Sequence, residues 1–448
     1  MNKEELKRFV CDYLDAHASQ LVASAEALLR MPELSYREER TSEFVGKAFA
    51  RLGLQEKTGL AITGRRAEAD TGRPGPCVGV LGELDALIVP NHPFADSETH
   101  AAHACGHHAG LNAMLGCAEA LTQPEVMREL SGRLAFVATP SEECQNQPYI
   151  ASLVDAGRLR FFGGKSEMIA EGVFDDIDIA MMGHAGNRLF TPSGFNGFVM
   201  KHLVFLGKAA HAGAYPEKGV NAIAMMRSAM NMLDAQRDTF RDEAHVRIHG
   251  YISEGGEAVN VVPDRIVYVL QVRGGSPEAI QDASEKVDRC VEASAVAFGG
   301  RAEVHNIFGF MPLIAYDSLD DLQQANVALV APKTPFTRGI YRPASTDMGD
   351  VSMIRPSLHL YFDGFAGTAH TDSFLATDLQ AAYVNPAKYL ALNAIDLLYG
   401  DASCGSRVAA EKCPMTKEEY LRAMEGFSSI KSFDHFKNTT PDNRNPPA

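Results

Sequence analysis

Short apolar segments alternate with helical segments through the first half of the chain, and this alternation limits the folds open to it. The segments 76–87, 132–139 and 176–182 are rich in apolar residues and end in polar turns, as strands buried on both faces do. Helical spacing marks residues 3–30, and residues 109–122 are small enough to pack closely on a sheet. The pattern predicts an α/β fold with a mostly parallel sheet covered by helices on both faces.

The pattern changes near residue 194. From there the chain shows a β-α-β-β-α order, with strands at 198–207, 244–253 and 258–273 and helices at 221–237 and 277–297. This order predicts a small inserted α+β domain with an antiparallel sheet. At 448 residues the chain is too long for one ordinary core, which also favours two domains. The predicted boundaries are 1–193 and 309–400 for the α/β domain, 194–308 for the insert and 401–448 for a C-terminal tail.

Composition excludes some partners. With 42 basic and 57 acidic residues the net charge is -15, which argues against nucleic acid or an anionic membrane as the main partner. We see no apolar run of about 18 residues, so no membrane span is expected. The charged N-terminus does not resemble a signal peptide, and the eight cysteines show no paired framework. We therefore expect a cytoplasmic protein with reduced thiols.

The segment from His100 to His108 places four imidazoles and one thiol within nine residues. Packing several imidazoles in a core is costly unless they are paired or bind a ligand. A pair of carboxylates, Glu142-Glu143, follows a predicted strand. Thiolate, imidazole and carboxylate are the donors that borderline divalent cations bind, and a carboxylate beside a ligand can serve as a base. The combination predicts a metal-dependent hydrolase.

Several of these residues fall where predicted strands end, which is where open α/β sheets place their ligands. Glu142, Glu143 and His184 follow apolar strands, and His370 stands in a loop of small residues. Each motif alone also fits a structural role. Cys105 and His107 could be a buried cysteine beside a structural histidine, and the two glutamates could begin a helix.

The chain contains a series of motifs in a specific order, covering roughly residues 20 to 400. They are Met-Pro-Glu-Leu-Ser-Tyr-Arg-Glu-Glu, Ala-Cys-Gly-His, Pro-Ser-Glu-Glu, Met-Met-Gly-His, Gly-Lys-Ala-Ala-His-Ala-Gly, Asn-Val-Val-Pro-Asp and Gly-Thr-Ala-His. In these the chain resembles the M20 peptidase and amidohydrolase family, in its branch with a cysteine metal ligand. The segment Ser345–Ser352 looks most similar to aminobenzoyl-glutamate hydrolase and related dipeptidases.

The resemblance implies a catalytic α/β domain that holds two divalent cations, and an insert that forms a homodimer and can close as a lid. Zinc or manganese is favoured, and cobalt or nickel would also fit. The thiolate of Cys105 would bridge the two cations, Glu142 would be the general base, and His211 would reach the partner subunit's site. The implied metal ligands are Cys105, His107, Glu143, His184 and His370, and the implied substrate-binding residues are Asn260 and Arg273.

Two departures from the family pattern concern the substrate. His108 stands where the family usually has Asp or Asn, and Cys-Gln-Asn-Gln rather than a glycine-rich turn follows Glu143. His108 could support the ligands from behind or compete for metal, and the pattern assigns no role to His100 and His103.

The expected function is metal-dependent hydrolysis of an amide bond in an N-acyl amino acid, an aminobenzoyl-glutamate-like conjugate or a dipeptide. Two alternatives stay open at this point. Cys105 could be the nucleophile of a metal-independent amidase, or the chain could be a non-catalytic binding protein on the same scaffold. The candidate hinges of a lid are residues 194–197 and 309–312.

Overall fold

The structure is a computed structural model that describes residues 1–436, apart from the side chain of Phe308. The chain divides into two compact units. The first unit comprises Met1–Phe195 and Leu313–Tyr420, and the second comprises Asn196–Pro312 and the residues from Leu421 onward. Among the described residues, no helix is both long and apolar enough to cross a membrane.

The first unit is built on a mixed sheet with a parallel centre. Within the described residues the sheet has nine strands, in the order β1-β2-β6-β3-β7-β15-β8-β13, and β14 pairs with β8. The four central strands β6, β3, β7 and β15 run parallel, whereas β1, β2 and β13 pair antiparallel. The bounds are β1 Gln55–Leu60, β2 Gly64–Asp70, β3 Cys77–Glu83, β6 Arg133–Thr139, β7 Ile179–Ala185, β8 Leu189–Phe195, β13 Leu313–Ile314, β14 Phe336–Arg342 and β15 Ser357–Phe362.

Helices cover both faces of this sheet, as alternate residues of β3 show. Gly82 faces α4 (His107–Leu121), and a Cβ atom at Gly82 would lie 2.8 Å from the Cα atom of Leu111. The next residue, Glu83, points to the opposite face, where it contacts Lys165 of α7 (Gly164–Glu171). The expected α/β architecture is therefore confirmed.

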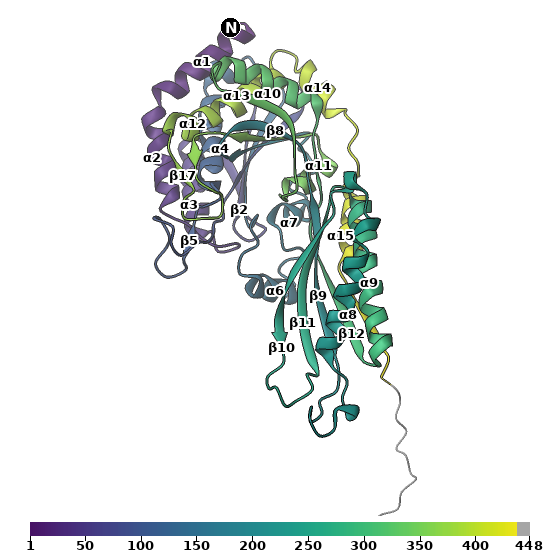
Figure 1. Cartoon of the computed structure of the whole chain (residues 1–448). Helices are drawn as coiled ribbons and strands as arrows, with labels where there is room; N and C mark the ends of the chain where they lie inside the picture. The colour runs from purple at the N-terminus through teal and green to yellow at the C-terminus, as the bar shows by residue number, and fades with distance from the viewer. Residues whose placement is uncertain (437–448) are drawn as a thin grey trace, which may run out of the picture. The chain divides into compact units, whose positions relative to one another are not determined.

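Further helices surround these two. Helices α1, α2 and α13 pack around α4, and α11 packs on α7 (Figure 1). The N-terminal segment 3–30 was predicted as one helix but forms two. His17 separates them, as the C-cap residue of α1 and the N-cap residue of α2. The bounds are α1 Lys3–Ala16, α2 Ala18–Leu29, α3 Glu39–Arg51, α5 Pro124–Met127, α6 Gln147–Asp155, α10 Asp317–Val330, α11 Met348–Ile354, α12 Leu379–Tyr383, α13 Asn385–Leu398 and α14 Ser403–Ala409; short strands are β4 Leu87–Ile88, β5 Ala101–Ala102, β16 Phe365–Ala366 and β17 Leu375–Ala376.

The second unit is an antiparallel sheet in the order β10-β11-β9-β12-β18. Helices α8 and α9 lie side by side along it (Figure 1), and their apolar residues share a core with Leu203 and Phe205 of β9. The bounds are β9 Gly197–Leu206, α8 Ala222–Ala235, β10 Arg247–Gly255, β11 Arg265–Gly274, α9 Pro277–Phe298, β12 Arg301–Phe310 and β18 Ser429–Asp434. The strand β11 begins later than predicted, because Pro263 lacks the N–H that a ladder needs.

The C-terminal segment differs from the prediction. Residues 401–448 were expected to form a tail, but the described part contains α14, α15 (Lys417–Phe427) and the edge strand β18. The strand pairs with β12, and Lys431 on it forms an ion pair with Asp288 on α9 at 2.7 Å. Six mostly polar residues carry little strand signal alone, so only pairing with β12 reveals this strand. The rest of the predicted tail, residues 437–448, lies outside the described residues.

A buried ion pair in the second unit gives a stability test. Lys201 of β9 is fully buried and its Nζ lies 2.5 Å from Asp288 Oδ1. Removing one partner leaves a buried charge unpaired, which typically costs about 3–5 kcal/mol. We expect Asp288→Ala to lower the free energy of unfolding by that amount in urea denaturation. Asp282→Ala is the matched control on α9, since its exposed pair with Lys286 should contribute less than about 1 kcal/mol. Equal losses in the two variants would contradict this account.

Candidate metal centre

The site is assembled where the parallel strands of the first unit end. Glu83 ends β3, a turn after β6 carries Glu142 and Glu143, and His184 lies near the end of β7. The carboxyl ends of parallel strands meet at one edge of the sheet, so these side chains gather there. The helix α4 starts at the same edge, directly after Cys105.

Gly106 makes the junction between Cys105 and His107 possible. Its φ is +86°, in the left-handed region, and it is the N-cap of α4. A Cβ atom at this position would lie 2.3 Å from the Cβ of Ala185, which no side chain could accept without a shift of the backbone. Glycine therefore allows the thiol of Cys105 and the imidazole of His107 to approach one point.

The structure brings the five predicted ligands together in two groups that share Cys105. One group is Cys105, His107 and His184, the other is Cys105, Glu143 and His370, and within each group the candidate ligand atoms lie within 4.8 Å of one another. The Sγ atom of Cys105 lies 3.5 Å from His184 Nε2 and 3.3 Å from His370 Nε2. A thiol placed between two imidazoles is the arrangement that a bridging ligand requires.

His370 comes from far along the chain. Its backbone is in the left-handed region, with φ +67°, and its N–H donates to the carbonyl oxygen of Ala104 at 2.9 Å. This bond fixes the loop over Cys105, and His370 Nε2 lies 3.4 Å from Glu143 Oε1. Strained backbone of this kind is often found at functional sites.

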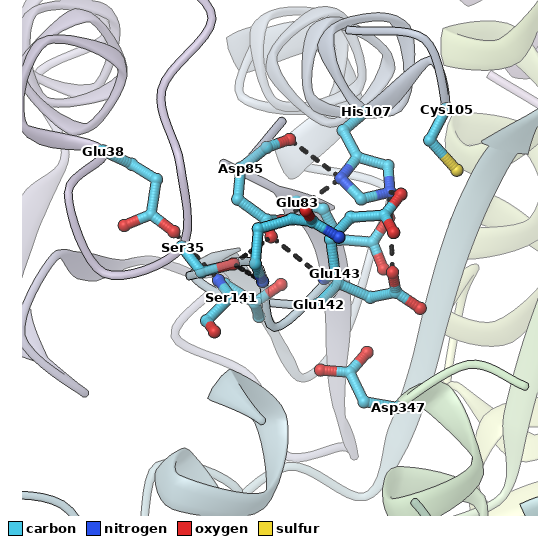
Figure 2. Close-up of polar contacts among 12 residues, drawn as sticks. Ser35, Glu38, Glu83, Asp85, Cys105, His107, Ser141, Glu142, Glu143 and Asp347 are labelled. Atoms are coloured by element: carbon cyan, nitrogen blue, oxygen red, sulfur yellow. Dashed lines mark hydrogen bonds and ion pairs between the residues drawn. The ribbon is translucent and has the colours of Figure 1, made fainter. Parts of the chain in front are cut away.

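The orientation of His107 is set by Asp85. Its Nδ1 lies 2.9 Å from the carbonyl oxygen of Asp85 and 3.2 Å from Asp85 Oδ1, so the hydrogen-bond network places the proton on Nδ1. The other nitrogen, Nε2, then faces carboxylate oxygens of Glu83, Glu142 and Glu143 at 3.4, 3.8 and 3.9 Å (Figure 2). Imidazole ligands of metals are commonly oriented by such an acceptor on the second nitrogen.

The same aspartate orders the loop that carries the two glutamates. Asp85 Oδ2 accepts the Glu143 N–H at 2.9 Å and the Ser35 hydroxyl at 3.0 Å. Nearby, Glu38 accepts the N–H of Ser141, whose φ is +51°. Glu38 is buried, and burial raises its pKa to about 8. These contacts hold Glu142 and Glu143 at the sheet edge.

The residues fit a bound cation. His107 Nε2 and Glu143 Oε1 are buried and have no hydrogen-bond partner among the described residues. Burial raises the pKa of Cys105, of Glu142 and of Glu143. Burial also lowers the pKa of His184 to about 4, which keeps its imidazole neutral. A buried cluster of thiol, carboxyl and imidazole groups is stabilised by a divalent cation, and this donor set suits zinc.

Glu142 belongs to neither group that contains the thiol. It lies with His107 and Glu143 in one set of neighbouring donors and with Glu83 and Asp347 in another, and only 8% of its surface is exposed. It is thus beside the ligand positions, where a base would stand.

The predicted residues of the second unit fall into two places. His211 and Asn260 are neighbours, because the Ala212 N–H donates to the carbonyl oxygen of Asn260 at 2.9 Å. Arg273 lies near the far end of β11, eight residues beyond Arg265, or roughly 26 Å at ~3.3 Å per residue. Its guanidinium donates to Gln271 Oε1.

The remaining histidines of the cluster do not join the thiol. His103 and His108 are buried with ring centroids 5.3 Å apart, and His108 Nε2 lies 3.2 Å from the Tyr383 hydroxyl. His100 is exposed. None of the three is in a group of neighbouring metal donors within the described part of the chain.

Our sequence reasoning missed three residues at this site, Glu83, Lys165 and Asp347. Lys165 Nζ lies 2.7 Å from Glu83 Oε1 and also contacts Asp347 Oδ1. The charge of Glu83 at the end of an apolar strand was a signal that could have been used. Lys165 and Asp347 lie 182 residues apart in sequence. Asp347 lies in the segment Ser345–Ser352 that resembles a known family, but nothing in the sequence places it beside Lys165 or the predicted ligands.

Comparison with known proteins shows what the chain is similar to. Residues 194–298 match the family model of the M20 peptidase dimerisation domain. The chain is 28% identical to mouse (Mus musculus) Xaa-Arg dipeptidase, covering 93% of this chain and 95% of that protein. It is 29% identical to one of the subunits of p-aminobenzoyl-glutamate hydrolase from Escherichia coli, over 53% of each protein. A Bacillus subtilis structure, described as a dinuclear metal binding peptidase from the M20 family, superposes with a TM-score of 0.68 at 20% identity, covering 86% of this chain and 99% of that one.

Proposed function

Because this chain belongs to the M20 family of peptidases and amidohydrolases, we propose that it hydrolyses a linear amide with metal-activated water. The substrate would be an N-acyl amino acid, an aminobenzoyl-glutamate-like conjugate or a dipeptide. The observation that carries this proposal is the position of the Cys105 thiol between His184 and His370, with His107 and Glu143 completing two groups of donors around it.

Two divalent cations, zinc or manganese in the first place and cobalt or nickel as alternatives, would bind at these two groups. Cys105, His107 and His184 would hold one, and Cys105, Glu143 and His370 the other. Cations bound there polarise a carbonyl group and lower the pKa of bound water. The donor set alone does not choose among the four metals, since availability also matters.

The protein's own groups would move the proton. Glu142 would accept it from the attacking water and return it to the leaving amine, as a general base and then a general acid. Its place beside both groups, among the buried carboxylates in Figure 2, supports this role.

His211 would donate a hydrogen bond to the carbonyl oxygen of the substrate across a homodimer, and would thus steady the oxyanion. Its Nδ1 accepts the N–H groups of Gly213 and Ala214 at 3.2 and 3.0 Å, which leaves the proton on Nε2. The exposed side chain is therefore a donor. The match of residues 194–298 to a dimerisation domain supports the dimer.

The second unit would also bind the substrate's carboxylate. Asn260 beside His211 is the better-supported residue for this role, and Arg273 would act at a separate place.

A cytoplasmic location is supported by the cysteines, because all eight lie within the described residues and are free.

A metal-independent cysteine amidase that uses Cys105 and a non-catalytic binding protein are the competing hypotheses. A cysteine nucleophile gives Glu142 and Glu143 no role, although Glu143 lies in one group of donors with the thiol and Glu142 lies beside Glu143 and His107. A binding protein would lack a base or a ligand, whereas here each position is filled.

The test of the function is a substrate panel with and without metal. We expect the purified protein to contain divalent metal by inductively coupled plasma mass spectrometry and to hydrolyse at least one member of a panel of N-acyl amino acids, aminobenzoyl-glutamate and dipeptides with C-terminal arginine. A chelator should abolish hydrolysis and added Zn²⁺ or Mn²⁺ should restore it. Hydrolysis that survives complete metal removal but not thiol alkylation would favour the cysteine mechanism instead.

Glu142→Gln tests whether Glu142 acts as the base without removing a predicted metal ligand. The amide keeps the shape of the side chain but cannot accept the proton, so kcat should fall by about 100-fold or more while metal content stays at the wild-type level. Glu43→Gln, at an exposed carboxylate on α3, should leave both unchanged. A Glu142→Gln enzyme that turns over at the wild-type rate would show that the base is another group.

His211→Ala tests the contribution of the second unit. Loss of an oxyanion donor typically costs on the order of 100-fold in kcat, and we expect that loss with unchanged metal content and an unchanged dimer in size-exclusion chromatography. The matched control is His435→Ala, another exposed histidine of the second unit. Full activity of His211→Ala with the dimer intact would remove this role.

A further inference from the structure

A buried ammonium group lies directly behind the candidate metal centre. Lys165 is fully buried, its Nζ contacts Glu83 Oε1 at 2.7 Å, and it also pairs with Asp347. The backbone N–H of Lys165 donates to Asp347 Oδ2 at 3.2 Å. These three residues, called here the Lys165 triad, join the start of α7, the end of β3 and the residue before α11.

The charges within the Lys165 triad do not balance. Two carboxylates face one ammonium, and the exposed fractions of Glu83 and Asp347 are only 3% and 0%. A net negative charge this deeply buried is costly unless a positive charge lies close to it. The Glu83 oxygen that does not contact Lys165, Oε2, indicates where a compensating cation would lie.

The two carboxylate oxygens of Glu83 face different groups: Oε1 contacts Lys165, and Oε2 faces the candidate metal ligand His107. Its Oε2 lies 3.4 Å from His107 Nε2, the buried nitrogen that has no hydrogen-bond partner among the described residues. Figure 2 shows Glu83 close to this ring. Lys165 therefore holds the carboxylate in the rotamer that presents Oε2 to the ligand atom of His107.

The two groups of donors also differ in charge. The group of Cys105, Glu143 and His370 contains a thiol and a carboxylate, whereas Cys105 is the only acidic donor in the group with His107 and His184. The thiolate is shared, so a cation at His107 would have less negative charge from the protein than its neighbour. The uncompensated negative charge of the Lys165 triad lies next to His107, in the group of donors that has less negative charge.

We propose that Glu83 is a further cation-binding residue at the group of Cys105, His107 and His184, and that Lys165 is the positioning residue that holds it there. This proposal rests on the proposed function, because it requires that cations bind at this centre. Glu83 adds a negative charge next to the cation at His107, and Lys165 and Asp347 keep that charge in place.

The test measures cation binding rather than activity. Metal-free protein is titrated with Mn²⁺ by isothermal titration calorimetry, and we expect two sites in the wild type. In Glu83→Gln one site should weaken by about 10- to 100-fold, the range seen when groups supporting a metal ligand are removed, and the other should keep its affinity. Lys165→Met should weaken the same site, because Glu83 loses its anchor. Glu68→Gln is the control, a partly exposed carboxylate of the first unit that pairs with Arg66.

A structural role alone would lower the melting temperature of the metal-free variants without changing the Mn²⁺ affinity of the folded protein. That result, or a Glu83→Gln titration identical to wild type, would overturn the proposal. If Glu83→Gln does not fold, Glu83→Asp decides, since it keeps the charge but withdraws the carboxylate by one methylene group. Wild-type affinity at both sites in Glu83→Asp would then overturn the proposal, and selective weakening of one site would support it.

Failure of this proposal is distinguishable from failure of the proposed function. A wild type that binds two cations but hydrolyses no amide would leave the role of Glu83 intact and remove the hydrolase. An active two-cation enzyme whose Glu83→Gln variant binds both cations normally would remove only the role of Glu83. A wild type that binds no cation would overturn both.

Discussion

The site depends on the close approach of buried acidic groups around one imidazole. Three carboxylates lie within 3.9 Å of His107 Nε2, and the thiol of Cys105 lies among the same donors. Such a cluster is unfavourable in a low-dielectric interior unless cations compensate for it. Folding of the first unit therefore buries more negative than positive charge at this site. The ammonium of Lys165 compensates for only part of the negative charge.

The scaffold explains how side chains so distant in sequence meet. Parallel strands deliver Glu83, Glu142, Glu143 and His184 to one edge, and the left-handed turn at Gly106 adds Cys105 and His107 at the start of α4. His370 arrives on a separate loop, where its N–H donates a hydrogen bond to the carbonyl oxygen of Ala104, next to Cys105. The candidate ligands of the first half of the chain thus lie at strand ends and at the start of α4, whereas His370 joins them from a loop.

The second unit carries His211, the proposed hydrogen-bond donor to the substrate. Its sheet and two helices form their own core, and its exposed loop fixes His211 as a donor through two backbone N–H groups. In the proposed function, the donors of the first unit would hold the cations, and His211 of the second unit would stabilise the charge that develops on the substrate. The proposed reaction would require both units, although each has its own core.

The sequence alone determined the α/β class and the inserted α+β segment, because apolar periodicity is a local property, and the resemblance of its motifs to the M20 family supplied the five candidate ligands. It did not reveal β18, whose six residues become a strand only by pairing with β12. It also did not reveal the Lys165 triad, because a lysine, a glutamate and an aspartate far apart in the chain are ordinary until folding buries them together. Burial and unpaired charge arise from three-dimensional proximity, so only the tertiary structure decided which charged residues belong to the site.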